Sequence, residues 1–426
     1  MKKTLAVILV LLLALSSAGP LSAMAEEKIT LRVAGMTGFG NGYEVNQEIM
    51  NGFTKLYPNV TIEYEEIPMD GSEWNVYVSK LQTMVASGNA PDVVDMATEG
   101  MQQIHKNGLA ISLNNFLASN IELRDQLLAD TEEVLYQPFN LDGELYCLMM
   151  QWNNCITHFN MDRLSAVGLD LPGEDWDKDE FLRYCEALTG EENGEKRYAL
   201  VVPAFYFAQS AWLFAFDASF LNADMTEAVV NSPNAVECFQ FMHDLIWKYG
   251  YAPVPQPGDD YTQLLIDGKV AMNCSGRWPV NAYDANNFRN VGVQYNPSFK
   301  KKANVYGTEG FIVMSGTKHY EEAAAFAAWT SSSDFIREFV KSGSCPARTS
   351  LGREIVEGYG FPKNAEIYFD SLNVNMKSVE SPIAYADIAS IYDTYFSMMM
   401  TDKNADIQTI CDTMAEEMNV ALAKTL

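Results

Sequence analysis

The first part of the chain alternates between stretches with the hydrophobic pattern of strands and stretches with that of helices. Apolar and polar residues alternate over 29–35 and 60–67, as in half-buried strands. Residues 43–56 and 74–87 carry apolar side chains at helical spacing, and each stretch ends at a Pro or Gly signal. A third short strand is predicted over 92–96. This order with short connections favours a parallel, doubly wound α/β sheet.

The rest of the chain continues the same mixture of strands and helices. Strands are predicted over 269–274, 291–295 and 310–314, and helices over 204–222, 232–250, 259–267 and 320–341. The segment 143–161 differs, because two extended stretches flank the polar residues 151–154. About 400 residues exceed what one core usually organises, yet no low-complexity linker is found. We therefore expect two α/β domains between which the chain crosses as extended strands.

The N-terminus has the pattern of a secretory signal peptide. Residues 1–3 carry two lysines, residues 5–15 are apolar, and residues 23–25 provide small residues for cleavage. We predict that residues 1–25 are removed on export. The apolar run is too short to span a bilayer, which takes about 20 residues. A lipoprotein would have a Cys at the cleavage site, whereas the first Cys is Cys147, so no lipid anchor is expected.

Charge and cysteine content narrow the possible partners. The net charge is −27, and such a chain repels nucleic acid and anionic membranes, so we expect neither as a partner. Seven cysteines leave at least one thiol unpaired in an exported protein. The spacing of Cys147 and Cys155 permits a disulfide without requiring one. No C-x-x-C motif supports a zinc or thioredoxin-like site.

One acidic segment permits two interpretations. Asp177 with Glu180 three residues later forms a capping box for the helix that follows. Asp175, Asp177, Asp179 and Glu186 also match positions 1, 3, 5 and 12 of a calcium loop. However, the sixth position of that loop is Glu180, where the turn needs Gly. We favour the helix cap, and we expect neither a metal nor a cofactor.

Five segments carry motifs that follow one another in a recognisable order. They are FTKLYPNV at 53–60, ASGNAPDVV at 86–94, FNMDRL at 159–164 with GLD at 168–170 and Trp176, DGKVAM at 267–272 with GRW at 276–278, and EAA at 322–324 with PAR at 346–348. The Gly-Lys-Val-Ala-Met and Gly-x-Trp pair is the most specific of them. The ordered set resembles the extracellular solute-binding proteins of ABC importers, in the sugar-binding group that includes the maltose-binding type.

This resemblance covers essentially the whole mature chain and implies a fold and a function. The implied fold is α/β, the two-lobed periplasmic-binding-protein fold of type II, with ligand in a cleft that closes by hinge bending. The lobes would comprise 28–152 plus 300–342 and 153–299 plus 343–426, with crossings near 150–154, 296–302 and 343–348. The resemblance implies a monomer outside the cytoplasm that captures a mono- or oligosaccharide for a membrane permease.

A sugar site combines aromatic rings, which cover C–H faces, with carboxylates, amides and guanidinium groups that bind hydroxyls. Such groups stand beyond the carboxyl ends of strands in α/β sheets. Trp278 of the Gly-x-Trp motif is the first candidate, because the resembling proteins stack this residue on ligand. The other candidates are Trp152, Gln151 and Asn153 in the polar segment, Trp212, Arg277, Thr37 and Phe39 after the first strand, Asp95 and Glu99 at the third, and Glu309 with Gly310. For Trp212 and for each acid, a core or capping role is an equal alternative.

Two other function classes stay open. A secreted carbohydrate-active enzyme would use two carboxylates, but among 56 acidic residues such pairs carry no weight. No H-E-x-x-H, G-x-S-x-G, P-loop or G-x-G-x-x-G motif is present. A protein of the same fold that binds a polyamine or peptide would suit the acidic charge. The content of aromatic residues and the resemblance favour a neutral sugar as the ligand. We therefore expect a binding protein that serves a transporter or a sensor, and not an enzyme.

Overall fold

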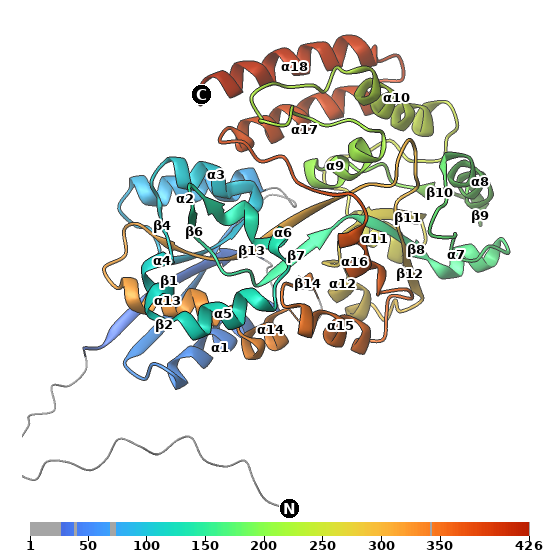
Figure 1. The fold of residues 1–426 in the computed structure, drawn as a ribbon. Coiled ribbons are helices and arrows are strands. Elements are labelled where there is room, and N and C mark those ends of the chain that lie inside the picture. The colour runs from blue at the N-terminus through green and yellow to red at the C-terminus, as the bar shows by residue number, and fades with distance from the viewer. Residues whose placement is uncertain (1–26, 38–40, 69–73, 341–342, 426) are drawn as a thin grey trace, which may run out of the picture.

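The computed structural model describes residues 27–37, 41–68, 74–340 and 343–425. The predicted signal peptide and Phe39 lie outside these ranges. Within them, no helix combines the length and the apolar composition that a membrane crossing requires. Two β-sheets lie side by side in Figure 1, and the long strand β13 extends toward the second sheet.

The first sheet has eight strands in the order β14-β7-β13-β3-β1-β2, and β4 and β15 also pair with β13. The strands are β1 (Ile29–Met36), β2 (Val60–Ile67), β3 (Val93–Ala97), β4 (Ala110–Ile111), β7 (Gln151–Asn154), β13 (Asn304–Met314), β14 (Cys345–Pro346) and β15 (Met376–Ser378). β1 pairs in parallel with β2 and β3, whereas β13 runs antiparallel to both β3 and β7. The strands predicted at 29–35, 60–67 and 92–96 are therefore present and parallel, as the alternating order of strands and helices indicates.

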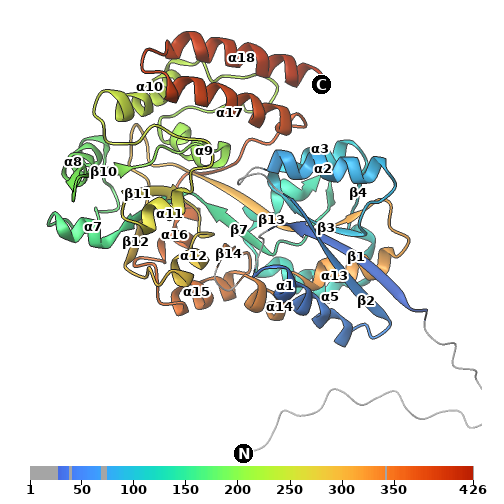
Figure 2. The same cartoon turned by 180° about the vertical axis from the view of Figure 1, so that it is seen from behind.

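Helices cover both faces of this sheet, and Figures 1 and 2 show α2 and α3 on one face and α1, α13 and α14 on the other. They are α1 (Tyr43–Met50), η1 (Asn51–Lys55), α2 (Trp74–Ala86), α3 (Thr98–Lys106), α4 (Asn114–Ser119), α5 (Ile121–Ala129), α6 (Glu133–Tyr136), η2 (Gln137–Phe139), α13 (Tyr320–Trp329) and α14 (Ser333–Phe339). The short hairpin of β5 (Asn140–Leu141) and β6 (Glu144–Leu145) follows η2. The sheet is buried on both faces, so β3 is buried at every position.

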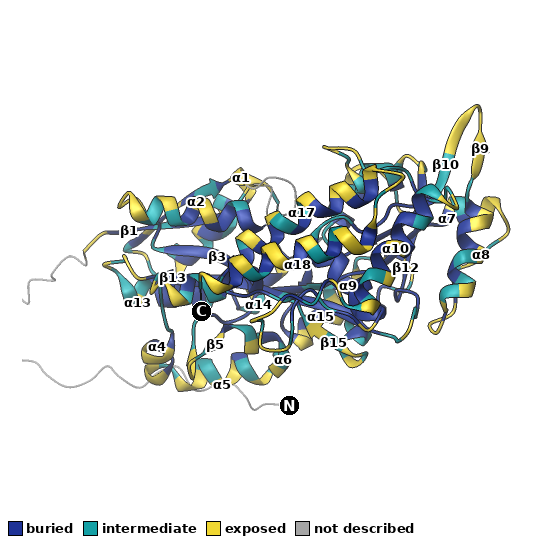
Figure 3. Ribbon diagram, turned by 90° about the horizontal axis from the view of Figure 1, so that it is seen from above, coloured by how far each residue is buried: buried dark blue, intermediate teal, exposed yellow. Residues whose placement is uncertain are grey.

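The second sheet has five strands in the order β12-β8-β11-β10-β9. They are β8 (Ile156–Asn160), β9 (Gly190–Glu192), β10 (Glu195–Leu200), β11 (Val270–Ser275) and β12 (Val291–Gln294). The helices around it are α7 (Met161–Ala166), α8 (Lys178–Leu188), α9 (Tyr206–Ala215), α10 (Pro233–Trp247), α11 (Tyr261–Ile266), α12 (Val280–Ala285), α15 (Thr349–Gly358), α16 (Ile367–Asp370), η3 (Ser371–Asn373), α17 (Tyr385–Thr401) and α18 (Ile407–Ala423). Figure 3 shows the β9–β10 hairpin projecting from the body with an exposed tip.

The chain passes between the two sheets at points where strands follow each other closely. β7 belongs to the first sheet, and β8 begins two residues after β7 ends and belongs to the second. β12 and β13 reverse this crossing. The polar residues 151–154 are therefore a strand themselves, paired on one side with β13 and on the other with β14.

Three predicted elements differ in extent from those observed. β13 begins at Asn304, six residues before the predicted start, and its additional residues pair with β7 and β15. The helix predicted over 204–222 ends at Ala215, after which Asp217 adopts a positive φ of 57°. The helix predicted over 320–341 is two helices, because the Ser332 side chain accepts a hydrogen bond from the Phe335 N–H and starts α14.

Candidate functional site

Trp278 lies at the end of β11, in the short turn that leads into α12. Its ring is half-buried and folds back over Gly276. The ring centroid of Trp278 is 6.0 Å from that of Phe205 and 6.2 Å from that of Phe207. Both phenylalanines stand at the start of α9. Three aromatic rings therefore converge at the carboxyl ends of β10 and β11, where α/β sheets place ligands.

Phe205 and Phe207 were not predicted as site residues. They belong to the apolar run of Trp212, a candidate for which a core role is an equal alternative in the sequence. Their special position arises because α9 begins only at Tyr206, so these two rings flank the first residue of the helix and not its middle. The signal available in the sequence was the Pro203 that interrupts the apolar run just before the helix.

Gly307 is the point at which segments of both sheets meet. A Cβ atom at this position of β13 would stand 3.0 Å from Phe207 Cε2 and 3.7 Å from Glu99 Oε2. Glu99 belongs to the first turn of α3, which packs on the first sheet. In the register of β7 and β13, Asn153 lies opposite Gly307. The absence of a side chain at Gly307 thus brings a carboxyl group, an aromatic ring and an amide to one place.

Asn153 and Arg277 connect the segments around Gly307 through hydrogen bonds. The Asn153 side-chain oxygen Oδ1 accepts from the Arg277 backbone N–H at 3.2 Å, and the side-chain nitrogen Nδ2 donates to Ser344 Oγ at 2.7 Å. The buried guanidinium of Arg277 donates through Nη1 to the carbonyl oxygens of Gly343 and Ser344 at 2.6 and 2.7 Å. The two residues therefore tie the turn that carries Trp278 to the segment before β14.

Three acidic side chains predicted for the site lie together near the end of β3. Asp95, Glu99 and Glu309 are 0%, 5% and 8% exposed. Burial raises the pKa of Glu99 to about 8 and that of Glu309 to about 6. Burial, and then the adjacent Glu309, raise the pKa of Asp95 well above its usual value. Gln151 donates to Glu309 Oε2 at 2.8 Å, so this predicted residue also belongs to the group.

Two predicted tryptophans are packed inside the protein. Trp152 is buried, and its ring contacts Phe369 edge-on at 5.9 Å. Trp212 is buried in the second domain, 4.9 Å from Phe299 and 5.8 Å from Phe181. Both rings are almost fully enclosed by protein side chains, and these ring contacts are with phenylalanines and not with Trp278.

Of the remaining candidates, the structure describes Thr37 and Gly310, and both act through their backbone. Thr37 is exposed, and its N–H donates to the Ile67 carbonyl at 3.0 Å, which extends the pairing of β1 and β2. Gly310 is buried in β13, where a Cβ atom would stand 2.6 Å from Cys147 Sγ. Gly310 therefore serves the close packing of β13 on the segment before β7. Phe39 lies outside the described residues.

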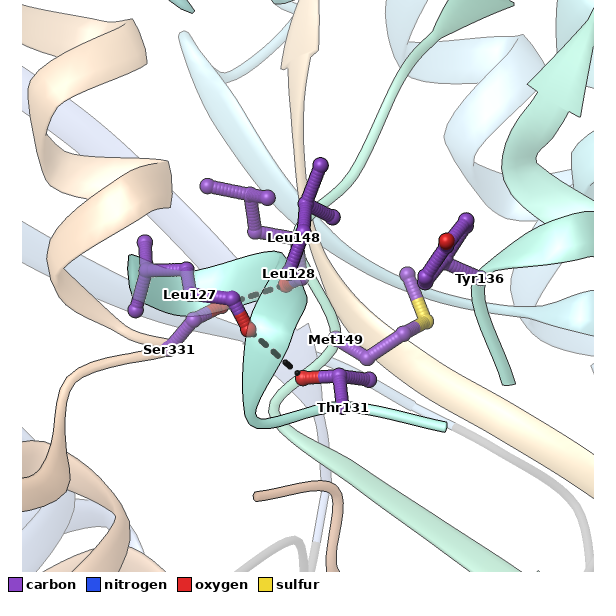
Figure 4. A pocket seen from close by; sticks show the side chains of 7 residues that line it. All are labelled: Leu127, Leu128, Thr131, Tyr136, Leu148, Met149 and Ser331. Carbon is purple, nitrogen blue, oxygen red and sulfur yellow. Dashed lines mark hydrogen bonds between the residues drawn. The ribbon is translucent and has the colours of Figure 1, made fainter. Parts of the chain in front are cut away.

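Two hollows lie away from this cluster. A groove of about 520 Å³ is lined by Thr98, Tyr306, Phe214 and Glu380 among others. Successive residues of a strand face opposite sides, so Tyr306 and Gly307 point to opposite faces of β13. Figure 4 shows a cavity of about 10 Å³, lined by Leu127, Leu128, Thr131, Tyr136, Leu148, Met149 and Ser331. That volume is enough for one water at most, so this cavity is a packing defect and not a ligand site.

The described residues offer no group of three or more His, Cys, Asp and Glu side chains placed to hold a metal ion. Asp177 accepts from the Glu180 N–H at 2.9 Å and caps α8, as predicted. All seven cysteines are buried and unpaired, including Cys147 and Cys155.

This architecture and site belong to a class of protein that captures small solutes between two α/β lobes. Residues 48–357 match the family described as bacterial extracellular solute-binding protein. The chain belongs to this family. The resemblance to extracellular solute-binding proteins, predicted from the ordered motifs, is thus confirmed.

Relatives known from sequence and from structure agree with this assignment. A putative binding protein of Brucella abortus (strain 2308) is 25% identical over 289 residues, which are 65% of this chain and 66% of that protein. The chain thus spans just under two thirds of the length of this curated relative. An ABC substrate-binding protein from Listeria monocytogenes, in complex with cycloalternan, matches with a TM-score of 0.82 at 21% identity, over 93% of this chain and 100% of that chain.

A second solved structure is that of an ABC transporter solute-binding protein from Thermotoga lettingae bound with alpha-D-tagatose. It matches with a TM-score of 0.79 at 19% identity, over 92% of this chain and 99% of that chain. Identities at this level establish the fold. They confirm the predicted α/β, two-lobed periplasmic-binding-protein architecture.

Proposed function

We propose that this protein is the substrate-binding subunit of an ABC importer and that it captures a carbohydrate outside the cytoplasm. The observation that carries the proposal is the convergence of Trp278, Phe205 and Phe207 with the Glu99 carboxyl at Gly307. Rings bury the C–H face of a sugar, while carboxyl and amide groups bind its hydroxyls. The sugars named for the solved structures of the same fold agree with this chemistry.

The ligand lies, in this proposal, between the lobe of residues 28–152 plus 300–342 and the lobe of residues 153–299 plus 343–426. Glu99 comes from the first lobe, and Trp278, Phe205 and Phe207 come from the second. A solute that contacts both sides favours the closed arrangement of the lobes, since only that arrangement makes all the contacts. The closed protein, as a monomer, then presents the surfaces of both lobes to a membrane permease.

The predicted site residues take different parts in this proposal. Trp278 and Glu99 contact the ligand, and Asn153, Gln151, Glu309 and Arg277 hold the junction around them. Thr37, Asp95 and Gly310 belong to the first sheet beside the site, and Trp152 and Trp212 pack inside the protein. Phe39, which lies outside the described residues, is proposed as a further ligand contact.

Binding without turnover is the second part of the proposal. The family consists of binding proteins, and no step of sugar chemistry is required for capture and release. The recovered ligand is expected to be chemically unchanged after prolonged incubation with the protein. Cleavage products in that sample would replace this proposal with a carbohydrate-active enzyme.

The test begins with thermal unfolding of the chain from Glu26 in the presence of mono- and oligosaccharides, amino acids, peptides and polyamines. A ligand that binds only the folded state stabilises it by about 2.7 kcal/mol at a hundredfold excess over Kd. We expect a shift with one class of sugar. A shift with a polyamine or peptide alone would keep the fold and overturn the carbohydrate assignment.

Calorimetry with Trp278→Ala then locates the site. Loss of the ring contact is expected to weaken binding of the same sugar at least about tenfold. Tyr249→Ala is the matched control, because Tyr249 is an exposed ring that stacks on Tyr251. An unchanged Kd in Trp278→Ala would remove Trp278 from the site.

A further inference from the structure

Three carboxyl groups are buried at the end of β3, and no ion pair of the described residues includes any of them. Asp95 lies on β3, Glu99 lies in the first turn of α3, and Glu309 lies on β13. Moving an isolated carboxylate out of water is costly, so such groups take up a proton unless a cation balances them. The arrangement therefore requires an explanation beyond ordinary packing.

Asp95 and Glu309 meet across the antiparallel pair of β3 and β13. The register places Glu309 opposite Ala97, two residues from Asp95 on the same face. Neither Asp95 carboxyl oxygen nor Glu309 Oε1 has a hydrogen-bond partner among the described residues, while Gln151 donates to Glu309 Oε2 at 2.8 Å. Burial and the neighbouring Glu309 carboxyl both disfavour a charge on Asp95. Two adjacent buried carboxylates without a cation repel each other, so we infer that the pair holds one proton.

The groups packed around the cluster do not supply a positive charge. Tyr77 of α2 donates to the Asp95 carbonyl at 2.8 Å. Burial, and after it nearby charges that include these acids, raises the pKa of Tyr64, Cys147 and Cys155. These neighbours are phenols and thiols, which carry no positive charge. A proton is thus the charge that we expect to balance the cluster.

Glu99 connects this cluster to the proposed ligand site. Its carboxyl group lies near Gly307, opposite Phe207, and it also experiences the charge of Glu309. Its neighbours therefore favour the protonated form of Glu99 when no ligand is present. A sugar hydroxyl that donates to this carboxyl group favours the ionised form instead.

We propose that capture of the solute expels a proton from this cluster, so that binding is linked to pH through Glu99. This inference rests on the proposed function, because it concerns the same site. In the step, the O–H bond of the Glu99 carboxylic acid breaks and the proton passes to water. The ligand hydroxyl donates to the resulting carboxylate, and no electrons are exchanged. Asp95 and Glu309 keep their shared proton, and their charge holds Glu99 protonated until ligand arrives.

The affinity for the solute consequently rises with pH. Burial raises the pKa of Glu99 to about 8, so at neutral pH most of the free protein carries the proton that ligand must displace. Where binding releases one full proton, affinity rises about tenfold for each pH unit below that pKa and levels off above it.

Calorimetry at pH 7 in two buffers of different ionisation enthalpy measures the released proton directly. The titrant is the sugar that gives the largest shift in the thermal screen. We expect nearly one proton released per ligand in the native chain, and none in Glu99→Gln, which also loses the dependence of affinity on pH. Glu63→Gln is the control, since Glu63 is an exposed acid on β2. Heats that do not depend on the buffer, or equal proton release in Glu99→Gln, would overturn the proposal.

A second arm needs no ligand and so separates this inference from the proposed function. The raised pKa values mean that the folded protein holds protons that the unfolded chain has lost, so its stability falls as pH rises through them. Asp95→Asn leaves Glu309 with an amide neighbour and removes the shared proton. Between pH 6 and 9 its Tm is expected to fall less than that of the native chain, by about 4 °C.

Parallel Tm profiles of Asp95→Asn and the native chain would show that no proton is shared. Failure of every sugar in the screen, with diverging profiles, would overturn the proposed function and leave the acid pair intact.

Discussion

The ring of Trp278 lies directly against the backbone of Gly276, two residues earlier in the chain. A Cβ atom at Gly276 would stand 1.9 Å from Trp278 Cζ3 and 2.8 Å from the Asn154 carbonyl oxygen. Both distances are too short for any side chain, so only glycine permits this arrangement. The Gly-x-Trp motif is thus a geometric requirement: its glycine lets the ring fold back toward Phe205 and Phe207.

Gly276→Ala is expected to weaken sugar binding at least as strongly as the loss of the ring, about tenfold or more. The added methyl group displaces the Trp278 ring from the aromatic cluster while the ring itself remains. Calorimetry with the sugar from the screen measures the change. Gly173→Ala is the matched control, because a Cβ atom at Gly173 meets nothing within 4 Å. Equal Kd values for Gly276→Ala and the native chain would show that the ring has another way to reach its ligand.

The strands of the first sheet were predictable because their side chains alternate in burial. β2 is buried at Val60, Ile62 and Tyr64 and exposed at Thr61 and Glu63, so its sequence shows a period of two. The crossing strand β7 could not be recognised in this way. It carries the sequence Gln-Trp-Asn-Asn, and its polar side chains are satisfied by partners from distant segments. Glu309 and Ser344 provide two of these partners, and neither is apparent from the local pattern.

Those candidate site residues that belong to a motif or directly follow a predicted strand could be named from the sequence. Trp278 was predicted from its motif and Glu99 from its place after a strand, and both remain predictions as ligand contacts. Phe205 and Phe207, which the structure places beside Trp278, were not predicted, because an apolar run looks the same whether it fills a core or lines a site. The pairing of Asp95 with Glu309 could not be predicted from the sequence, since the two are 214 positions apart and the register of β3 and β13 brings them together.

His158 links the helix behind Trp278 to the segment that follows the third crossing. Its Nδ1 lies 2.9 Å from the Tyr283 hydroxyl of α12, and its Nε2 lies 3.0 Å from the Tyr368 hydroxyl of α16. All three residues are buried. Tyr368→Phe leaves one ring nitrogen without a partner and is expected to lower the free energy of unfolding by about 1–3 kcal/mol in urea titrations. A change below about 0.5 kcal/mol would mean that the bridge contributes little.

The same histidine predicts a loss of stability in acid. Burial lowers the pKa of His158 to about 3, below the value of about 6.5 for an unfolded histidine. The unfolded chain therefore gains the proton first, so the contribution is complete above pH 6.5 and is lost as pH falls toward 3. In this window the protonation of His158 in the unfolded chain lowers the free energy of unfolding by about 1.4 kcal/mol per pH unit. Urea titrations at pH 7, 5.5 and 4.5 are expected to show His158→Gln losing less stability with acid than the native chain. His319→Gln, on a partly exposed histidine, should follow the native chain.

Asp177 provides a prediction about the helix cap that was favoured over a calcium loop. Its side chain accepts from the Glu180 N–H at 2.9 Å. Asp177→Ala is expected to cost about 1 kcal/mol, whereas Asp177→Asn retains an oxygen acceptor and should cost a few tenths. Chemical unfolding with and without millimolar calcium measures both. Calcium-dependent stabilisation of the native chain that disappears in both variants would instead support the calcium loop.

Arg348 and Asp130 form the ion pair that fastens the third crossing to the first domain. Arg348 Nε donates to Asp130 Oδ2 at 3.0 Å, and the Arg348 side chain is only 7% exposed. Partial burial alone would raise the pKa of Asp130, but hydrogen bonds from Ser350 and the Arg348 charge outweigh it and lower the pKa. Arg348→Ala therefore removes a partner from a group that is held ionised and largely away from water.

The expected loss for Arg348→Ala is about 2–3 kcal/mol of unfolding free energy, measured in urea at pH 7. Arg337→Ala is the comparison, because the Arg337–Glu354 pair is exposed on both sides and should contribute less than about 1 kcal/mol. The lowered pKa of Asp130 also sets a direction with pH: the difference between Arg348→Ala and the native chain should shrink as pH falls below about 4 and Asp130 becomes protonated. Equal losses in the two arginine variants would show that burial does not strengthen the crossing pair, and that the third crossing is held by β14 alone.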